Sequence, residues 1–283
     1  MDRFEELLDE AAAVPVEGWD FSWFAGRATE ERPEWGYARL MGAAMAKATA
    51  ALDLQTGGGE VLAGVPVPPP VLVATESWRP NVPIAARNLR AAGGVVVEAA
   101  AGPCLPFRAG SFDLVVSRHP EHTPWDEVAR VLRPGGTFLS QQIGAGTNRE
   151  LSEAVLGPLP PPDRNSPGQL RAAAEAAGLR VLQARPARLR VEFFDVAAVA
   201  YFLRKVVWTV PGFSIERHRP QLRAIHERIQ AEGSFVSHST RVLIEAVKPG
   251  NNERAATGHD SNSNSNAGSN SKPDGNNTSE GNN

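Results

Sequence analysis

Short apolar runs alternate with segments of helical periodicity through the middle of the 283-residue chain. Near-continuous apolar runs that are separated by helices are typical of parallel strands buried on both faces of a sheet. Five such runs lie at 50–54, 71–75, 95–98, 112–117 and 137–141. Two later runs, 181–190 and 241–248, raise the expected number of strands to seven. The pattern therefore predicts an α/β fold with a mostly parallel seven-stranded sheet and helices on both faces.

Helical periodicity fills the segments between these runs and in front of them. The expected helices cover 2–12, 33–48, 80–92, 124–132, 167–177, 194–208 and 220–231. Thr123 is expected to cap the fourth helix, with Asp126 completing a T-x-x-D capping box. The last two helices form an insert, about 193–231, that is longer than a hairpin connection needs. We expect this insert to cap a functional site, and residues 1–48 to form an N-terminal helical lid before an α/β domain of residues 49–250.

The end of the chain has a different composition from the rest. Residues 251–283 are dominated by Asn, Ser and Gly and contain no aromatic residue, Val, Ile or Leu. Such a segment buries too little apolar surface to offset the entropy lost on ordering. We therefore predict a disordered tail, whose composition does not distinguish a solubility segment from a partner-binding one.

Composition also excludes several classes of protein. A single cysteine, Cys104, rules out an internal disulfide or a multi-cysteine metal site, and no metal is expected. The first residues are acidic and amphipathic, unlike a secretory signal, and prolines interrupt the longest apolar stretch. The net charge of −3 gives no general attraction to nucleic acid. By elimination we expect a cytoplasmic protein without a membrane partner.

The first candidate for chemistry is a glycine-rich loop after the first strand of the sheet. The segment 51–60 reads ALDLQTGGGE, so glycines follow the strand directly and let the backbone approach a ligand closely. The spacing is not that of the dinucleotide G-x-G-x-x-G motif and no P-loop lysine follows, which disfavours phosphate binding. An ordinary tight turn is the alternative interpretation.

An acidic residue, Glu76, ends the second strand. The carboxyl end of this strand borders the crevice where α/β sheets of this kind bind ligands. A carboxylate there can accept hydrogen bonds from both hydroxyl groups of a ribose. A solvated loop glutamate is the alternative, and the position about twenty residues after the glycine loop favours the ribose role.

Together with these two features, the later motifs resemble a known family. They are LPF at 105–107, SFDLVV at 111–116 and EVARVLRPGG at 127–136, followed by another apolar strand. Their order is similar to that of class I S-adenosylmethionine-dependent methyltransferases, particularly the type 11 group, and the match covers about residues 50–142. LPF…SFDLVV and EVARVLRPGG are the more specific segments. The resemblance implies a Rossmann-like fold and methyl transfer from S-adenosylmethionine.

The resemblance also implies roles for particular residues. The cofactor would lie across the carboxyl ends of the first two strands. Gly57 and Gly59 would face its methionine moiety, and Asp53 would orient its ammonium group. Glu76 would hold the ribose hydroxyl groups and Leu105 would flank the adenine. Arg118, at the end of the fourth strand, is the remaining expected cofactor contact.

Two positions depart from the family pattern. Gln55 stands where the first glycine of D-x-G-x-G-x-G belongs, so it needs a negative φ or tolerates strain of about 1–3 kcal/mol. Ala101 occupies the position near the adenine amino group where family members commonly have an acidic residue. These departures leave open a non-catalytic S-adenosylmethionine-binding or scaffold protein of the same fold.

The acceptor side is less determined by the sequence. If the acceptor loses a proton, His119 is the candidate base and Glu121 could orient it, with a polar surface loop as the alternative. Most aromatic residues in this region are expected to anchor the N-terminal helices to the sheet, and Trp19 and Phe21 are the candidates for an aromatic lid over a substrate. Twelve Lys and Arg against six Asp and Glu between 180 and 248 keep RNA possible as acceptor. A small molecule is favoured, and the oligomeric state is not predicted.

Overall fold

The computed structural model describes residues 2–16, 21–99, 102, 104–162 and 164–250. Contacts group the chain up to Pro249 into one compact unit, which contains the sheet. The predicted disordered tail lies outside the described residues. No helix in the described part of the chain is both long and apolar enough to cross a membrane.

One sheet runs through the unit with the strand order β1-β7-β8-β6-β5-β2-β3-β4. The strands are β1 (Ala28–Glu30), β2 (Ala50–Leu54), β3 (Val71–Glu76), β4 (Val95–Glu98), β5 (Phe112–Arg118), β6 (Leu132–Ile143), β7 (Arg180–Phe193) and β8 (Phe235–Val247). The strands from β2 to β6 pair in parallel, whereas β8 is antiparallel to both β6 and β7. The Rossmann-like, mostly parallel sheet predicted from the sequence is therefore confirmed.

The sheet has eight strands, so the predicted number of seven was wrong by one. The additional strand, β1, has only three residues and pairs antiparallel with the end of β7. Its sequence, ATE, contains no apolar alternation. Its pairing depends on a distant partner, and a local pattern could not have revealed it.

Seven of the nine α-helices in the described part of the chain coincide approximately with predicted segments. The short helices at 60–63 and 149–156 were not predicted. The α-helices are α1 (Arg3–Ala13), α2 (Tyr37–Met45), α3 (Glu60–Ala63), α4 (Val82–Leu89), α5 (Trp125–Val131), α6 (Arg149–Leu156), α7 (Pro167–Ala176), α8 (Val196–Lys205) and α9 (Arg219–Glu232). The 3-10 turns are η1 (Ser22–Phe24), η2 (Arg79–Asn81) and η3 (Arg90–Ala92).

Two helix starts test whether side-chain caps can be predicted from the local sequence. Ser166 caps α7 and Gln169 completes the capping box, as the Ser-Pro start suggested. The predicted cap of α5 by Thr123 was wrong, because α5 has no side-chain cap. Thr123 is buried, and its hydroxyl group instead accepts a hydrogen bond from the Gln142 amide at 3.1 Å. Tertiary pairing here replaced the local capping bond.

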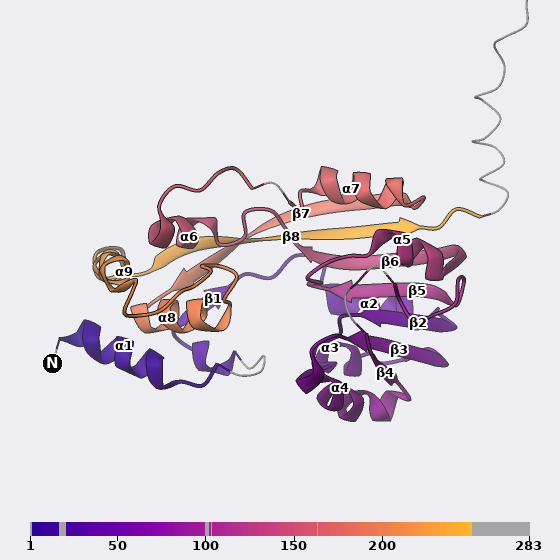
Figure 1. Ribbon diagram of the computed structural model, residues 1–283, viewed down its shortest axis with the longest axis horizontal. Helices are drawn as coiled ribbons and strands as arrows, with labels where there is room; N and C mark the ends of the chain where they lie inside the picture. The colour runs from indigo at the N-terminus through magenta and orange to yellow at the C-terminus, as the bar shows by residue number, and fades with distance from the viewer. Residues whose placement is uncertain (1, 17–20, 100–101, 103, 163, 251–283) are drawn as a thin grey trace, which may run out of the picture. The chain divides into compact units, whose positions relative to one another are not determined.

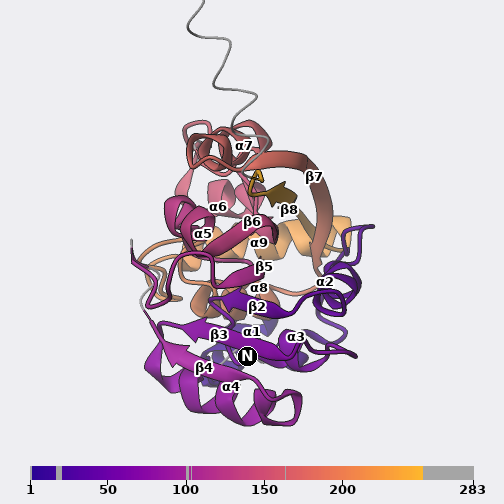
Figure 2. The same ribbon diagram turned by 90° about the vertical axis from the view of Figure 1, so that its right-hand side faces the viewer.

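Each face of the parallel strands has its own apolar cluster. The α2 face packs residues of α2, α3 and α4 against the sheet, with Tyr37, Met41 and Leu89 among the buried side chains. The opposite face packs α5 and α7, with Val128 and Leu170 buried. In Figure 2, α2 and α5 lie on opposite sides of these strands. Helices on both faces, as predicted, sandwich the sheet.

A third apolar cluster surrounds the far ends of the long strands β7 and β8. Helices α1, α6, α8 and α9 contribute to it, together with Phe193 and Phe235 at the strand ends. Figure 1 shows β7 and β8 running side by side from these helices to the parallel strands. The predicted insert therefore packs with the first N-terminal helix, while α2 packs on the parallel sheet. The roles of cap and lid stay predictions.

Candidate functional site

Polar side chains gather on the α2 face at the carboxyl ends of the parallel strands. Residues that pair directly across a sheet share a face, and the face alternates along each strand. Val116 pairs with Asp53 on β2 and with Leu139 on β6. Val116 and Leu139 belong to the cluster beneath α2. Two residues further along, Arg118 pairs with Gln141, so both lie on this face as well.

The same register extends this face to both sides. Glu76 lies two residues beyond Ala74, which pairs with Asp53. Arg241 on β8 pairs with Ile143, two residues beyond Gln141. We call this set of polar side chains the carboxyl edge. In strand order it comprises Glu76, Asp53, Arg118, Gln141 and Arg241.

Glu76 is held rigidly at one end of the carboxyl edge. Its carboxylate is buried and accepts hydrogen bonds from the backbone N–H of Gly57 and of Trp78, both at 2.7 Å. Each carboxylate oxygen has a second lone pair that these contacts leave available. The bond to Gly57 also links the glycine loop to the end of β3. Glu76 can therefore accept hydrogen bonds from a ligand without changing its conformation.

The glycine loop needs its glycines for two different reasons. Gly57 and Gly59 both have positive φ, of 64° and 78°, which glycine adopts without strain. A Cβ atom at Gly59 would lie 3.3 Å from the backbone of Ala85, so this glycine lets α4 pack closely. A Cβ atom at Gly57 would meet nothing within 4 Å. Gly57 therefore presents an open backbone surface beside Glu76.

Asp53 is almost completely buried at the end of β2. Burial raises the pKa of its carboxyl group to about 7, the Thr56 hydroxyl group partly opposes this, and the charge of Glu76 adds to it. The Thr56 hydroxyl oxygen is buried and forms no well-aligned hydrogen bond with the described residues. Near neutral pH, Asp53 therefore exchanges a proton readily and would be stabilised as a carboxylate by a cationic ligand group.

Gln55 adopts the strained alternative that its sequence position allowed. Its φ is 56°, in the left-handed region. Its side-chain amide donates to the carbonyl oxygen of His122 at 2.6 Å and accepts from the N–H of Glu121 at 2.7 Å. These bonds offset the strain and tie the glycine loop to the loop after β5. The Gln55 side chain thus spans the space between the two loops, which a glycine would leave open.

The LPF and EVAR motifs meet in a single hydrogen-bonded clamp. Glu127 accepts from the N–H of Leu105 at 2.6 Å and forms an ion pair with Arg130. Arg130 in turn donates to the carbonyl oxygens of Leu105 and Phe107. The pKa of Glu127 is lowered, chiefly by the hydrogen bond from Arg130. The clamp fixes Leu105, which is buried at the end of the loop predicted to flank the adenine.

His119 lies after β5 within a chain of three side chains. The Trp35 indole N–H donates to Gln141 Oε1 at 2.8 Å, and Gln141 Nε2 lies 2.8 Å from His119 Nε2. An indole can only donate, so it fixes the orientation of the amide, and His119 Nε2 must accept. The imidazole proton is therefore on Nδ1.

This arrangement bears directly on the predicted base. Burial, together with the charges of Arg118 and Arg241, lowers the pKa of His119 to about 2. Its Nε2 lone pair is already used by Gln141. Both features weigh against proton abstraction by His119 and favour a role as a neutral hydrogen-bond donor. Glu121 is exposed and forms no hydrogen bond with His119 in the described part of the chain.

Gln141 and Arg241 of the carboxyl edge were not foreseen, and neither was Tyr37 on α2. The Tyr37 hydroxyl group donates to the carbonyl oxygen of Ser117 at 2.9 Å, and burial together with the charge of Asp53 raises its pKa. Gln141 connects Trp35 to His119. A half-exposed aromatic residue, Trp78, also lies two positions after Glu76 in the chain. The aromatic pattern before residue 50 signalled Trp35 and Tyr37 only as a group, without a partner.

The remaining predicted residues are placed only in part. Phe21 is 41% exposed and stacks on Phe24, with Lys205 Nζ 5.3 Å from its ring. It therefore lies against the cluster at the ends of β7 and β8. Trp19 and Ala101 lie outside the described residues. The substrate and adenine roles proposed for them stay predictions.

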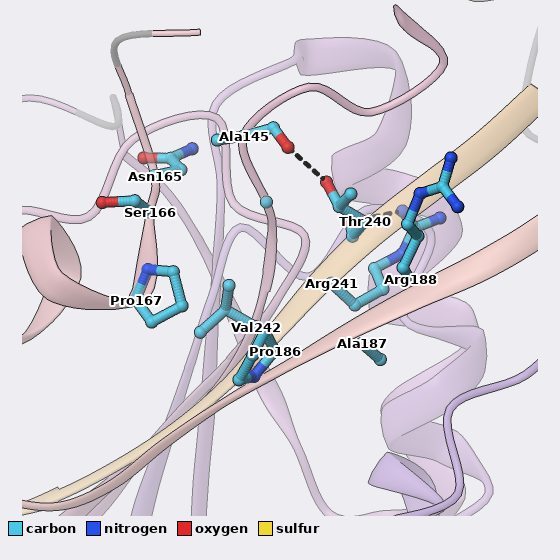
Figure 3. Close-up of a pocket in the computed structure, with 11 residues that line it drawn as sticks. Ala145, Asn165, Ser166, Pro167, Pro186, Ala187, Arg188, Thr240, Arg241 and Val242 are labelled. Atoms are coloured by element: carbon cyan, nitrogen blue, oxygen red, sulfur yellow. Dashed lines mark hydrogen bonds between the residues drawn. The ribbon is translucent and has the colours of Figure 1, made fainter. Parts of the chain in front are cut away.

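Two cavities among the described residues lie away from Glu76 and the glycine loop. One of about 280 Å³ is lined by Pro167, Pro186 and Val242, with Thr240 at its rim. Figure 3 shows the Thr240 hydroxyl group directed at the carbonyl oxygen of Ala145, 2.9 Å away. The other, of about 340 Å³, lies beside Trp35. Neither holds the polar groups of Asp53 and Glu76.

The acidic end of the carboxyl edge, formed by Glu76 and Asp53, fits S-adenosylmethionine. A buried carboxylate with free lone pairs suits ribose hydroxyl groups, and a buried carboxyl group of pKa about 7 suits an ammonium group. The Thr56 hydroxyl oxygen, which forms no well-aligned hydrogen bond with the described residues, lies in the same loop as the open surface at Gly57. Beside this loop, the Gln55 amide bonds to the loop after β5.

Comparison with known proteins agrees with this geometry. Residues 52–140 match a family model described as a methyltransferase domain. No curated protein matches the chain. A solved structure of a proposed methyltransferase from Bacillus halodurans C-125 is similar with a TM-score of 0.55 and 20% identity, covering 76% of this chain and 99% of that one.

Two other solved structures have the same fold. The YcgJ protein of Bacillus subtilis gives a TM-score of 0.54 at 16% identity, covering 76% of this chain and 99% of that one. A protein of unknown function from Deinococcus radiodurans R1 gives 0.55 at 16% identity, covering 78% and 90%. At these identities the similarity concerns the fold. With the match at residues 52–140, it confirms the resemblance to class I methyltransferases that the motifs indicated.

Proposed function

We propose that this protein is an S-adenosylmethionine-dependent methyltransferase that acts on a small-molecule acceptor. The observation that carries the proposal is the pair of buried carboxyl groups, Asp53 and Glu76, at adjacent strand ends beside the open backbone of Gly57. The match of residues 52–140 to a methyltransferase domain supports the same conclusion. When bound, the cofactor supplies an electrophilic methyl group.

The protein contributes binding and alignment to this reaction. Glu76 accepts hydrogen bonds from the ribose hydroxyl groups, and Asp53 as a carboxylate binds the ammonium group. Trp78 is a candidate platform for the adenine because its indole is half-exposed and its backbone N–H group contacts Glu76. The Glu127–Arg130 clamp holds Leu105 in place. Catalysis then rests on holding the acceptor in line with the methyl group in a site shielded from water.

The alternative function is a non-catalytic cofactor-binding or scaffold protein of the same fold. It is supported by Gln55, whose side chain bridges the two loops that flank the proposed site. Production of S-adenosylhomocysteine from S-adenosylmethionine in the presence of a cell extract, above an extract-only control, would contradict this alternative. A chain that binds the cofactor without any such turnover would support it.

Calorimetric titration of the full chain with S-adenosylmethionine and S-adenosylhomocysteine tests the proposed site. We expect micromolar binding that Glu76→Gln weakens by about tenfold or more, which is about 1.4 kcal/mol. The amide would turn an N–H group toward the backbone donors of Gly57 or Trp78, disrupting the anchored carboxylate.

The matched control is Glu98→Gln, because Glu98 is the neighbour of Glu76 across the sheet and is exposed. It should leave the affinity unchanged. A folded wild-type chain that binds neither compound would overturn the proposed function. Equal weakening by the two variants would overturn the assignment of Glu76.

A further inference from the structure

The charges along the carboxyl edge change sign from one end to the other. The β3 and β2 end carries the carboxyl groups of Glu76 and Asp53. The β5 and β8 end carries the guanidinium groups of Arg118 and Arg241, on the same face of the sheet. The acidic end suits the ammonium and hydroxyl groups of the proposed cofactor. The resemblance implied a cofactor contact for Arg118, but its position at the basic end, beyond Asp53, also makes it available to a second ligand.

The basic end offers hydrogen-bond donors with few acceptors of its own. The Trp35–Gln141 pair fixes His119 with its proton on Nδ1, and this N–H has no hydrogen-bond partner in the described part of the chain. The Arg118 side chain is exposed and likewise forms no hydrogen bond or ion pair with the described residues. Because the His119 ring contacts Gln141, which pairs with Arg118 across the sheet, both donors are available on the same face.

Arg241 adds a second positive charge that is only partly neutralised. It is 9% exposed, and one terminal nitrogen donates to Glu30 at 2.6 Å while the other donates to its own strand at Thr240. Glu30 is itself half-exposed, so water weakens its effect on the site. Arg118 and Arg241 each raise the cost of protonating His119, which places both charges within electrostatic range of the ring. The local charge is therefore positive around a neutral donor.

We propose that His119 Nδ1–H and the Arg118 guanidinium group, supported by the charge of Arg241, bind an anionic group of the methyl acceptor. The acceptor is then a small molecule that carries a carboxylate or a phosphate. Guanidinium and N–H donors recognise both groups in the same way. This inference rests on the proposed function only in naming the ligand as the acceptor, because the anion site depends on His119 and Arg118 and not on Glu76 or Asp53.

The test uses the full chain with inorganic phosphate and, separately, acetate as probes. Each is titrated with and without S-adenosylhomocysteine while the ring ¹H and ¹⁵N signals of His119 are followed by NMR, assigned with His119→Gln. The ¹⁵N shifts first establish that the proton lies on Nδ1. We expect at least one probe to shift the Nδ1–H signal and to saturate. The stronger probe identifies the group as carboxylate or phosphate.

Arg118→Gln should weaken this binding by about tenfold, which is about 1.4 kcal/mol. The matched control is Arg87→Gln, because Arg87 is an exposed arginine on α4 without a hydrogen bond or ion pair to the described residues. The control should leave the binding unchanged. Both substitutions remove the same charge, so the comparison separates a local site from general electrostatic attraction.

The two proposals fail separately. No shift of the His119 signal with either probe, or equal weakening by Arg118→Gln and Arg87→Gln, would overturn the anion site even if S-adenosylhomocysteine binds. If S-adenosylhomocysteine does not bind, the proposed function fails, while a saturating shift that depends on Arg118 still supports an anion site. If a variant fails to fold, the wild-type titration alone decides whether either probe binds at His119.

Discussion

The acidic and basic ends of the carboxyl edge are held in place by different means. At the acidic end, Glu76 is anchored by two backbone N–H groups, which the sheet and the glycine loop supply. At the basic end, His119 is oriented through two side chains, Gln141 and Trp35. Backbone anchors follow from the fold itself, whereas a chain of side chains depends on the identity of each member.

This difference suggests how each end can change. The acidic end should keep its function as long as the strands and the loop form. The basic end can be altered by one substitution that leaves the fold intact. We therefore expect ligand recognition at the β5 and β8 end to be the more variable property, and the following experiments test this contrast between the two ends.

The largest expected effect is a dependence of stability on pH through Asp53. Its carboxyl group titrates at about pH 7 in the folded chain, against an ordinary value of 3.8. Between these values the folded chain keeps a proton that the unfolded chain has released. The free energy of unfolding should therefore fall as the pH rises from about 4 to about 7, by about 4 kcal/mol at most, and level off above. Chemical denaturation across this range measures it, with Asp53→Asn as the control that lacks this contribution.

The same group should couple cofactor binding to pH. An ammonium group beside Asp53 favours the carboxylate. Below pH 7, the affinity for S-adenosylhomocysteine should therefore rise by up to about tenfold for each unit by which the pH increases. Calorimetry at several pH values follows this rise. An affinity that stays level from pH 6 to pH 8, and equally so in Asp53→Asn, would remove Asp53 from the acidic end.

An intermediate effect is expected from Gln55, which lies between the two ends. Gln55→Gly should raise the affinity for S-adenosylhomocysteine by about fivefold, because it removes the amide that spans the two loops and tolerates the positive φ. Calorimetry measures the change. Gln55→Ala is the informative control, since it removes the bridge but keeps the backbone strain. Weaker binding in both variants would mean that the Gln55 amide itself holds the ligand.

The smallest effect should come from Trp35→Phe at the basic end. Without the indole N–H, the Gln141 amide is free to rotate, and His119 is no longer restricted to the form with its proton on Nδ1. Binding of phosphate or acetate should weaken by about threefold, while affinity for S-adenosylhomocysteine stays the same. The matched control is Trp125→Phe, which lies on the opposite face of the sheet. An altered cofactor affinity without any change at His119 would show that the two ends are not separate.

Sequence patterns predicted much of the acidic end and little of the basic end. Strand β2 and the acidic end of β3 could be predicted from consecutive residues, because a buried strand and the loop that follows it leave a local signature. The position of Glu76 follows from where its strand ends. His119 was noticed as a polar residue after a strand, but its protonation depends on Gln141 and Trp35, which the sequence did not connect with it.

The sequence by itself determined the α/β class, the seven longer strands, the glycine loop and the acidic residue that ends β3. The tertiary structure alone decided the pairing of β1 with β7, the loss of the Thr123 cap and the hydrogen bond between Trp35 and Gln141, which are 106 residues apart. The reason is physical. Burial periodicity is repeated along neighbouring residues, whereas a contact between distant residues depends on strand order and register, and only the assembled sheet establishes these.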